Sequence, residues 1–359
     1  MTLPKIAFPA RRRTRLSPKT ALRGLLSAEQ VGAILERERA RSDRTGEVFS
    51  LVVLEVGKDA SGQDTLGQLA TILQRRLRLT DDAGLLDSRR IGVVLPITPA
   101  AGAWTVVDDV CLCVRAGLPL PQCTVYCYPT DWPDNGVEQG NGEQLDKERP
   151  AQPMEQLFVR RLPIWKRTID IVGAVIGLIL LSPLLAAAAL AVRISSKGPV
   201  LFSQWRDGLG GEPFKIHKFR SMVVDAERRQ AELMAFNEQQ GPVFKIRNDP
   251  RVTPMGRFLR KTSIDELPQL WNVLKGEMSL VGPRPPLHHE VCQYRPWQRH
   301  RLDVTPGLTC SWQVQGRSRI PFLEWMRMDV RYIRSRSIWQ DFGLLLRTVP
   351  AVLFRTGAN

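Results

Sequence analysis

An uncharged apolar run extends from residue 171 to residue 192 and is interrupted near its middle by Ser182-Pro183. As one straight helix the run would be about 33 Å long, enough to cross the hydrocarbon core of a bilayer. Proline lacks an N–H group and clashes with the preceding turn, so Pro183 is expected to kink or break the helix. The part before the break covers only about 16 Å, roughly half of the core.

Basic residues flank the apolar run on both sides: Arg160, Arg161, Lys166 and Arg167 before it, and Arg193, Lys197 and Arg206 after it. Positive flanks favour the cytoplasmic face of a membrane. A helix-break-helix hairpin over residues 166–194, entering and leaving on that face, satisfies both observations. An ordinary spanning helix with a proline kink is the alternative, because membrane helices tolerate proline.

The charge of the chain indicates an anionic neighbour. A net charge of +15 and a pI near 10.1 are typical of proteins that meet nucleic acid, anionic lipid or phosphorylated substrates. No recognised nucleic-acid motif accompanies the charge, so we expect lipid rather than nucleic acid. DNA binding would instead predict a salt-dependent shift of duplex DNA. The six cysteines form no zinc pattern, which indicates reduced thiols in a cytoplasmic setting.

Residues 25–128 are expected to form a small α/β domain. Ser27 and Gln30 make a capping box for a first helix. Apolar runs and periodicities then predict a strand at 48–56, a helix at 65–79, a hairpin of strands at 84–86 and 91–95, a helix at 100–115 and a strand at 123–128. This order, α-β-α-β-β-α-β, resembles the palm of the diguanylate cyclase (GGDEF) family. The family's signature turn is replaced by Asp87-Ser88-Arg89-Arg90-Ile91, so the resemblance implies a domain without cyclase activity.

The remaining boundaries follow from composition. Residues 1–24 form a basic tail with Arg11-Arg12-Arg13 but no apolar stretch after it, so a cleaved signal peptide is not expected. Residues 129–157 are rich in proline, Asn-Gly pairs and charges, and are predicted to be a linker without a packed core. Residues 158–359 make up the last domain, which holds the chemistry.

Two adjacent carboxylates, Asp265 and Glu266, have two interpretations. Ser263-Ile264-Asp265-Glu266 fits a capping box, and acidic residues favour the first turn of a helix. As a catalytic pair, the two side chains would point about 100° apart on a helix and would therefore do different work. Both interpretations can hold together, because a helix N-terminus also favours a bound anion.

Basic residues near this pair are candidates for phosphate binding. Arg284 lies between Pro283 and Pro285, which fix the backbone and would present its guanidinium rigidly to a phosphate or nucleotide. A rigid turn with a structural ion pair is the alternative. Arg260 precedes the carboxylates by about one turn, where it would bind a lipid phosphate or face headgroups. Lys218 and Arg220 alternate with apolar residues, as on a half-buried strand.

Residues 165–359 resemble the bacterial sugar transferases, which are monotopic phosphoglycosyl transferases that act on polyprenyl phosphate. The matching segments occur in the order of that family, and the number of matches makes the resemblance specific. They are Lys166-Arg167-Thr168-Ile169-Asp170, Ser182-Pro183, Lys197-Gly198-Pro199, Phe214-Lys215-Ile216-His217-Lys218-Phe219-Arg220, Asn248-Asp249-Pro250-Arg251, Asp265-Glu266, Gly282-Pro283-Arg284-Pro285, Pro306-Gly307-Leu308-Thr309 and Trp312-Gln313-Val314-Gln315-Gly316-Arg317.

The resemblance implies an α+β membrane-associated (monotopic) domain with a re-entrant helix broken at Ser182-Pro183. It implies transfer of a sugar 1-phosphate from a nucleoside diphosphate sugar, expected to be a UDP-sugar, to polyprenyl phosphate, with release of UMP. This reaction would start exopolysaccharide, capsule or another lipid-linked glycan. In this family the aspartate, Asp265 here, is the nucleophile, and Asp265 and Glu266 hold Mg²⁺.

The resemblance also implies the surroundings of the enzyme. Substrate contacts would come from Arg284, Pro283, Pro285, Arg260, Lys218, Arg220 and Arg317, and the enzyme would work at the bacterial inner membrane, facing the cytoplasm. A homo-oligomer stays open, and no nucleic-acid partner is expected. Asp207 and Glu212 depart from the family pattern and bear on substrate choice. The competing hypothesis is a non-catalytic membrane scaffold or sensor that uses the cyclase-like domain.

Overall fold

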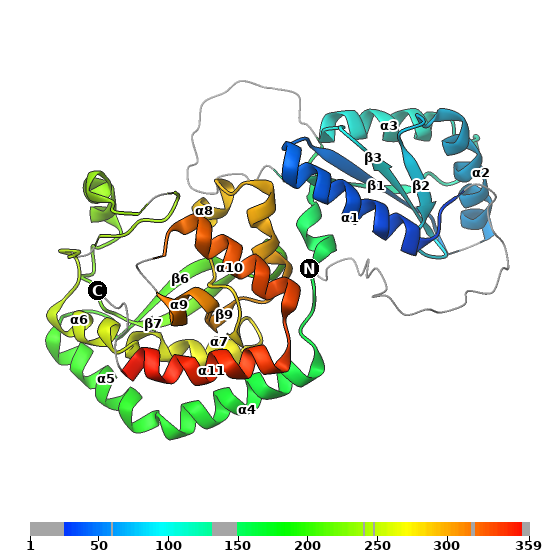
Figure 1. The fold of residues 1–359 in the computed structure, drawn as a ribbon. Helices are drawn as coiled ribbons and strands as arrows, with labels where there is room; N and C mark the ends of the chain where they lie inside the picture. The colour runs from blue at the N-terminus through cyan, green and yellow to red at the C-terminus, as the bar shows by residue number, and fades with distance from the viewer. Residues whose placement is uncertain are drawn as a thin grey trace. The chain divides into compact units, whose positions relative to one another are not determined.

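The computed structural model describes residues 25–58, 60–130, 149–239, 241–246, 248–316 and 320–353. The chain divides into two compact units (Figure 1). The first comprises residues 1–157 together with Arg295–Trp297, and the second comprises Phe158–Tyr294 and residues 298–359.

The first unit is built on a five-stranded sheet with the order β2-β3-β1-β4-β5. Strand β1 lies in the centre and is antiparallel to both β3 and β4. Strand β2 pairs antiparallel with β3, and β5 pairs parallel with β4. The elements are α1 (Ala28–Thr45), β1 (Phe49–Glu55), α2 (Ala60–Arg76), β2 (Asp82–Leu85), β3 (Arg90–Leu95), α3 (Ala100–Leu112), β4 (Gln122–Tyr128), β5 (Gln152–Pro153) and the 3₁₀ helix η1 (Met154–Phe158).

Helices cover both faces of this sheet. On one face α2 and α3 pack on alternate strand residues such as Val52 and Leu54, which form the main core of the unit. The intervening residues Leu51 and Val53 are also buried, and because strand side chains alternate they face the opposite side. There α1 covers the sheet (Figure 1).

The predicted order of elements in this unit is confirmed, and so is the capping box of Ser27 and Gln30, which forms in both directions. The linker prediction is wrong for its last residues. Strand β5 adds to the free edge of β4, and Met154 is fully buried. Thr130 donates its hydroxyl to the buried carboxylate of Glu155 at 2.6 Å. The composition of residues 129–157 did not indicate an ordered end, because the pairing of β5 with β4 joins two segments that are distant in the sequence.

The second unit contains a helical hairpin, two short sheets and a group of short helices. Its elements are α4 (Ile164–Leu180), α5 (Ser182–Ser195), β6 (Leu201–Asp207), η2 (Leu209–Gly211), β7 (Pro213–Phe219), η3 (Arg228–Phe236), α6 (Pro254–Lys261), η4 (Ile264–Gln269), α7 (Leu270–Lys275), β8 (Ser279–Val281), α8 (His288–Cys292), η5 (Pro296–Asp303), β9 (Gly307–Thr309), α9 (Ser311–Gln315), α10 (Phe322–Ser335) and α11 (Ile338–Leu353). Strands β6 and β7 pair antiparallel, whereas β8 and β9 pair parallel.

The apolar run breaks where the sequence predicts. Helix α4 ends at Leu180, and α5 begins at Ser182 with Pro183 in its first turn, where a proline costs no hydrogen bond. Among the described residues no single helix is long and apolar enough to cross a membrane. The pair α4 and α5, bent by 62°, reaches that length and composition only together.

The two helices have a packed face and an exposed apolar face. Ala174 of α4 and Ala188 and Val192 of α5 are buried against the rest of the unit. The opposite face exposes large apolar side chains: Ile171, Val172, Val175, Ile176, Ile179, Leu180, Leu184, Leu190 and Ile194. An apolar surface of this extent is typical of a lipid or protein contact.

Charged residues at the start of α4 fix the hairpin to the domain. Arg167 donates to the carbonyls of Val273 and Leu274 at 2.6 and 2.7 Å, at the end of α7. Asp170 accepts from the hydroxyl of Ser279 and the amide of Leu280. Lys166 forms a buried ion pair with Asp341 of α11. Of the basic flank predicted to mark the cytoplasmic face, Lys166 and Arg167 therefore serve internal contacts.

We expect Asp341→Ala to lower the free energy of unfolding by about 3–5 kcal/mol, because it leaves the Lys166 ammonium buried without its partner. Glu324→Ala removes a partner from the exposed ion pair with Arg327 and serves as the control, with an expected cost of about 0–1 kcal/mol. Thermal or urea unfolding of the detergent-solubilised variants measures both effects. Equal losses in the two variants would contradict the prediction.

Candidate active site

Asp265 and Glu266 lie on the 3₁₀ helix η4, between α6 and α7. Ser263 precedes this helix with a left-handed backbone (φ +55°) and makes no capping hydrogen bond through its side chain. The capping box predicted for Ser263 and Glu266 is therefore wrong, because an N-cap residue needs an extended backbone to reach the following amides. Capping does not account for the two carboxylates.

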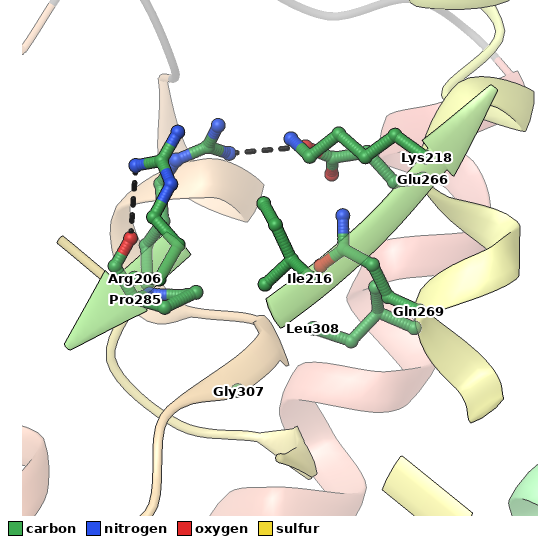
Figure 2. A pocket seen from close by; sticks show the side chains of 9 residues that line it. Arg206, Ile216, Lys218, Glu266, Gln269, Pro285, Gly307 and Leu308 are labelled. Atoms are coloured by element: carbon green, nitrogen blue, oxygen red, sulfur yellow. Dashed lines mark hydrogen bonds and ion pairs between the residues drawn. The ribbon is translucent and has the colours of Figure 1, made fainter. Parts of the chain in front are cut away.

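Glu266 is held by two cations that come from other parts of the chain. Lys218 on β7 donates to its Oε1 atom at 2.8 Å, and Arg284 donates to the same oxygen at 3.1 Å. Figure 2 shows Lys218 and Glu266 side by side at one end of a pocket. Burial alone would raise the pKa of Glu266, but the charges and hydrogen bonds of Lys218 and Arg284 outweigh it and hold that pKa well below its usual range. Glu266 therefore stays ionised.

Asp265 has a different environment although it is the adjacent residue. Its side chain is buried, with the residue 7% exposed, and accepts no hydrogen bond from the described residues. Burial and the negative charge of Glu266 raise the pKa of Asp265 to about 6, against the opposing charges of Lys218 and Arg260. At neutral pH this carboxylate is mainly ionised and still has its lone pairs available. The expectation that the two acids do different work is consistent with these surroundings.

The pocket is lined by residues of β6, β7, β9, the 3₁₀ helix η4 and the segment after β8: Arg206, Ile216, Lys218, Glu266, Gln269, Arg284, Pro285, Gly307 and Leu308 (Figure 2). It encloses only about 10 Å³, the space of roughly one water molecule. A ligand larger than water would fit here only if lining side chains such as Lys218 and Arg284 moved. The two cations that neutralise Glu266 thus also line the pocket.

Close backbone approach shapes the floor of this pocket. A Cβ atom added to Gly307 would lie 2.0 Å from the amide nitrogen of Gly282, so no other residue fits at this position without a shift of the backbone. Gly307 begins β9, which runs beside β8, and the Arg284 segment follows β8 directly. The contact between the two glycines brings Arg284 and Leu308 to the same pocket.

The structure brings together part of the set predicted from sequence. Lys218, Glu266, Arg284 and Pro285 line the pocket, and Asp265 adjoins it. Pro283 instead contributes its carbonyl to the amide of Gly307. Arg260 donates to the hydroxyl of Ser221 at 2.9 Å but is near enough to Asp265 to lower its pKa.

Two further predicted substrate residues are not placed at the pocket. Arg220 donates to the carbonyl and hydroxyl of Ser196, at the C-terminal end of α5, and does not line the pocket. Its geometry is that of a fold contact that caps the second hairpin helix. Arg317 lies outside the described residues.

Arg206 and Gln269 line the pocket but were not predicted as site residues. Arg206 lies at the end of β6, and burial together with the charge of Arg284 lowers its pKa to about 10, so it remains charged. The available signal is a basic residue at alternating spacing on a strand. Gln269 gave no signal in the sequence.

The carboxylates fit a magnesium ion that takes most of its ligands from substrate. No group of three or more His, Cys, Asp or Glu side chains gathers anywhere in the described part of the chain. Mg²⁺ is often bound by one or two carboxylates, with phosphate oxygens and waters completing the shell. Asp265 has both oxygens available, whereas Glu266 already shares Oε1 with Lys218 and Arg284. Asp265 is therefore the better donor, with Oε2 of Glu266 as the second.

Comparison with known sequences covers the second unit. The family described as "Bacterial sugar transferase" matches residues 161–355. A "Galactosyl transferase CpsE" of Streptococcus agalactiae is 48% identical over 198 residues, 55% of this chain and 44% of that protein. A "UDP-glucose:undecaprenyl-phosphate glucose-1-phosphate transferase" of Caulobacter vibrioides is 42% identical over 230 residues, 61% of this chain and 80% of that protein.

An "Exopolysaccharide production protein ExoY" of Rhizobium meliloti is 37% identical over 197 residues, 54% of this chain and 87% of that protein. The chain spans less than half of the length of several longer relatives, among them an "Undecaprenyl-phosphate galactose phosphotransferase" of Salmonella typhimurium, which is 42% identical and 41% covered.

Solved structures that are similar to part of this chain include a diguanylate cyclase and GGDEF domains. The diguanylate cyclase SiaD of Pseudomonas aeruginosa, in complex with its activator SiaC, has a TM-score of 0.26 and 24% identity, and the match covers 31% of this chain and 49% of that one. The GGDEF domain of DgcB from Caulobacter crescentus has a TM-score of 0.26 and 16% identity, over 33% and 80%. At these scores the resemblance of the first unit to the cyclase palm stays a prediction.

Proposed function

Because the chain belongs to the bacterial sugar transferase family, we propose that it transfers a sugar 1-phosphate from a UDP-sugar to polyprenyl phosphate, expected to be undecaprenyl phosphate. The reaction releases UMP and starts an exopolysaccharide, a capsule or another lipid-linked glycan. The names of the relatives support the donor and the acceptor, since one of them names UDP-glucose and undecaprenyl phosphate.

One observation supports the chemistry most directly. A buried carboxylate without a hydrogen-bond partner among the described residues, Asp265, lies next to a carboxylate that two cations keep ionised. Arg206 adds a third positive charge to the same pocket. Such a site combines a nucleophile with positive charge aimed at a diphosphate, and both are needed for covalent phosphoryl transfer.

In the first step, an ionised oxygen of Asp265 attacks the β-phosphorus of the UDP-sugar. A bond forms between that oxygen and phosphorus, and the bond from phosphorus to the bridging oxygen breaks. UMP leaves with the electron pair, while Lys218 and Arg284 move from Glu266 to the phosphate oxygens and balance the developing charge. When bound, Mg²⁺ supplies further charge neutralisation at the diphosphate.

In the second step, a phosphate oxygen of polyprenyl phosphate attacks the same phosphorus. The acyl-phosphate bond to Asp265 breaks, the carboxylate is regenerated, and a polyprenyl diphosphate sugar is formed. Splitting the transfer into two displacements lets one pocket serve a soluble donor and a lipid acceptor in turn. In this proposal Arg260, which lies on α6 near Asp265, would bind the acceptor phosphate.

Release of UMP from a panel of UDP-sugars tests the proposed function. Detergent-solubilised full-length protein is incubated with polyprenyl phosphate and Mg²⁺, and UMP is quantified. We expect release with one donor or a few, dependence on polyprenyl phosphate for turnover beyond one equivalent, and loss on chelation with EDTA that added Mg²⁺ restores. Folded protein that releases no UMP from any donor would contradict the proposal.

We further propose that α4 and α5 enter the inner membrane as a re-entrant hairpin from the cytoplasmic side. The support is the 62° break and the exposed apolar face of the two helices. Arg161 and Arg193 are exposed and flank the hairpin. In a background with serine at all six native cysteines, Arg161→Cys and Arg193→Cys should both react with an impermeant maleimide in inverted vesicles. A spanning helix would instead expose one of them only in right-side-out vesicles.

A further inference from the structure

The backbone that carries Arg284 is held almost entirely through its carbonyl groups. Residues 283–286 are Pro-Arg-Pro-Pro, and proline has no N–H to donate. Four successive carbonyls each accept a hydrogen bond. Those of Pro283 and Pro286 accept from the amides of Gly307 and Asp207 at 2.8 and 3.1 Å. The carbonyl of Pro285 accepts from Arg206 at 3.2 Å, and that of Arg284 accepts from Arg301 at 2.8 Å.

Arg301 makes its contact at the residue whose side chain reaches Glu266. It lies on the 3₁₀ helix η5 and is only 7% exposed. Its Nη2 atom donates to the carbonyl of Arg284, while Nη1 donates to the hydroxyl of Tyr294 at 2.8 Å. Its Nε atom is ion-paired at 3.0 Å with Asp329, a buried residue of α10. Each of the three nitrogens therefore has a different partner.

This arrangement uses properties specific to arginine. A guanidinium is planar and presents its N–H groups in fixed directions, so two directed hydrogen bonds, to the Arg284 carbonyl and the Tyr294 hydroxyl, together with the ion pair to Asp329 restrain its position. Asp329 supplies the negative charge that a buried guanidinium requires. Lysine at this position could keep the positive charge but could not hold Asp329, Tyr294 and the Arg284 carbonyl with the same geometry.

We propose that Arg301 is a positioning residue, which fixes the backbone of Arg284 and thereby sets where its guanidinium meets the substrate diphosphate. Arg301 does not line the pocket and touches no reacting atom. Asp329 acts indirectly, because its ion pair with Arg301 holds the Arg301 guanidinium in place. The inference rests on the proposed function, because it assigns Arg301 a role in the same phosphate-binding site.

Arg251 provides a closely matched control for a purely structural role. It is 5% exposed, pairs with the carboxylate of Asp249 at 2.7 Å and donates to the backbone carbonyl of Ala226 at 3.0 Å. Its guanidinium also lies over an aromatic ring, that of Phe244. Arg251 thus has the same kinds of partners as Arg301, but its carbonyl partner is not in the Arg284 segment.

A double-mutant cycle tests the inference. We expect Arg301→Lys to lower kcat/KM for the UDP-sugar by about 10- to 100-fold, the cost of a small misplacement of a substrate-binding group. Arg251→Lys should change kcat/KM by less than about threefold, assayed where both variants are folded. In an Arg284→Ala background, Arg301→Lys should have almost no further effect on kcat/KM. If Arg301 acts through Arg284, the effects of the two substitutions are not additive in free energy.

Two results of this cycle would overturn the inference. One is that the effects of Arg301→Lys and Arg284→Ala multiply, and another is that Arg251→Lys lowers kcat/KM as much as Arg301→Lys. If Arg301→Lys does not fold, Asp329→Asn replaces it in the same cycle with the same expected direction. The wild type is measured in parallel, so that a failure of the proposed function can be told apart from a failure of the role of Arg301. An inactive wild type would contradict the proposed function and not the role of Arg301.

A crystal structure of Arg301→Lys gives a readout that does not depend on turnover. We expect the Arg284 carbonyl to shift and the 3.1 Å contact between Arg284 and Glu266 to lengthen or break. An unchanged Arg284 in a well-ordered Arg301→Lys structure would overturn the positioning role, whatever the activity of the protein.

Discussion

Asp265→Asn should lower sugar-phosphate transfer by at least about 10³-fold, the scale on which enzymes lose activity when a nucleophile is removed. Asparagine keeps the size of the side chain but cannot form the acyl phosphate. Because Asp265 accepts no hydrogen bond from the described residues and burial raises its pKa, the neutral amide should not lower stability. UMP release with the preferred donor measures the loss.

Trapping of the intermediate separates this prediction from a general effect on the site. Protein incubated with a sugar-labelled donor and no polyprenyl phosphate should retain about one equivalent of sugar phosphate, on the peptide that contains Asp265. Asp225→Asn is the control, since it removes a carboxylate from a surface ion pair with Arg229 and should be labelled like the wild type. Label on the Asp265→Asn protein would exclude Asp265 as the nucleophile.

Arg284→Ala is expected to lower kcat by about 10²- to 10³-fold, the usual cost of losing one charged group that stabilises a transition state. Two losses combine in this variant. The diphosphate loses a guanidinium that faces it, and Glu266 keeps only Lys218 as a partner in the free protein. Steady-state kinetics with the preferred UDP-sugar measures the effect.

Arg284→Lys shows whether geometry or charge matters at this position. Lysine keeps the charge but loses the fork of donors, so we expect activity between those of the wild type and Arg284→Ala. Arg327→Ala removes an exposed positive charge from α10 and should leave kcat unchanged. Full activity in Arg284→Ala would show that Lys218 and Arg206 suffice for the diphosphate, and would leave Arg284 as a structural ion pair.

Local patterns predicted a large part of the fold. The break between α4 and α5 depends on Pro183 itself, and a proline acts on the turn that contains it. The order of elements in the first unit followed from hydrophobic periodicity and from the capping box of Ser27. Each of these signals depends on residues that lie close together in the sequence, so it can be recognised without the tertiary structure.

Other residues with a clear local signal have a different or an additional role in the folded protein. Ser263 and Glu266 have capping-box spacing, yet the left-handed backbone at Ser263 prevents the cap. Lys166 and Arg167 read as a membrane flank, yet they bind Asp341 and the end of α7. At Ser263 the backbone conformation of the folded chain determined the outcome, and at Lys166 and Arg167 contacts with distant residues did.

The sequence by itself determined which groups were available: adjacent carboxylates, an arginine between prolines and a broken apolar helix. Only the tertiary structure decided which of them meet. Lys218 reaches Glu266 across 48 residues, Arg284 reaches it across 18, and Arg206 and Arg301 hold the segment between the prolines. Such meetings depend on how strands and helices pack, and spacing along the chain carries no information about them. The pKa values of Asp265 and Glu266 differ for the same reason, because burial and charged neighbours exist only in the folded protein.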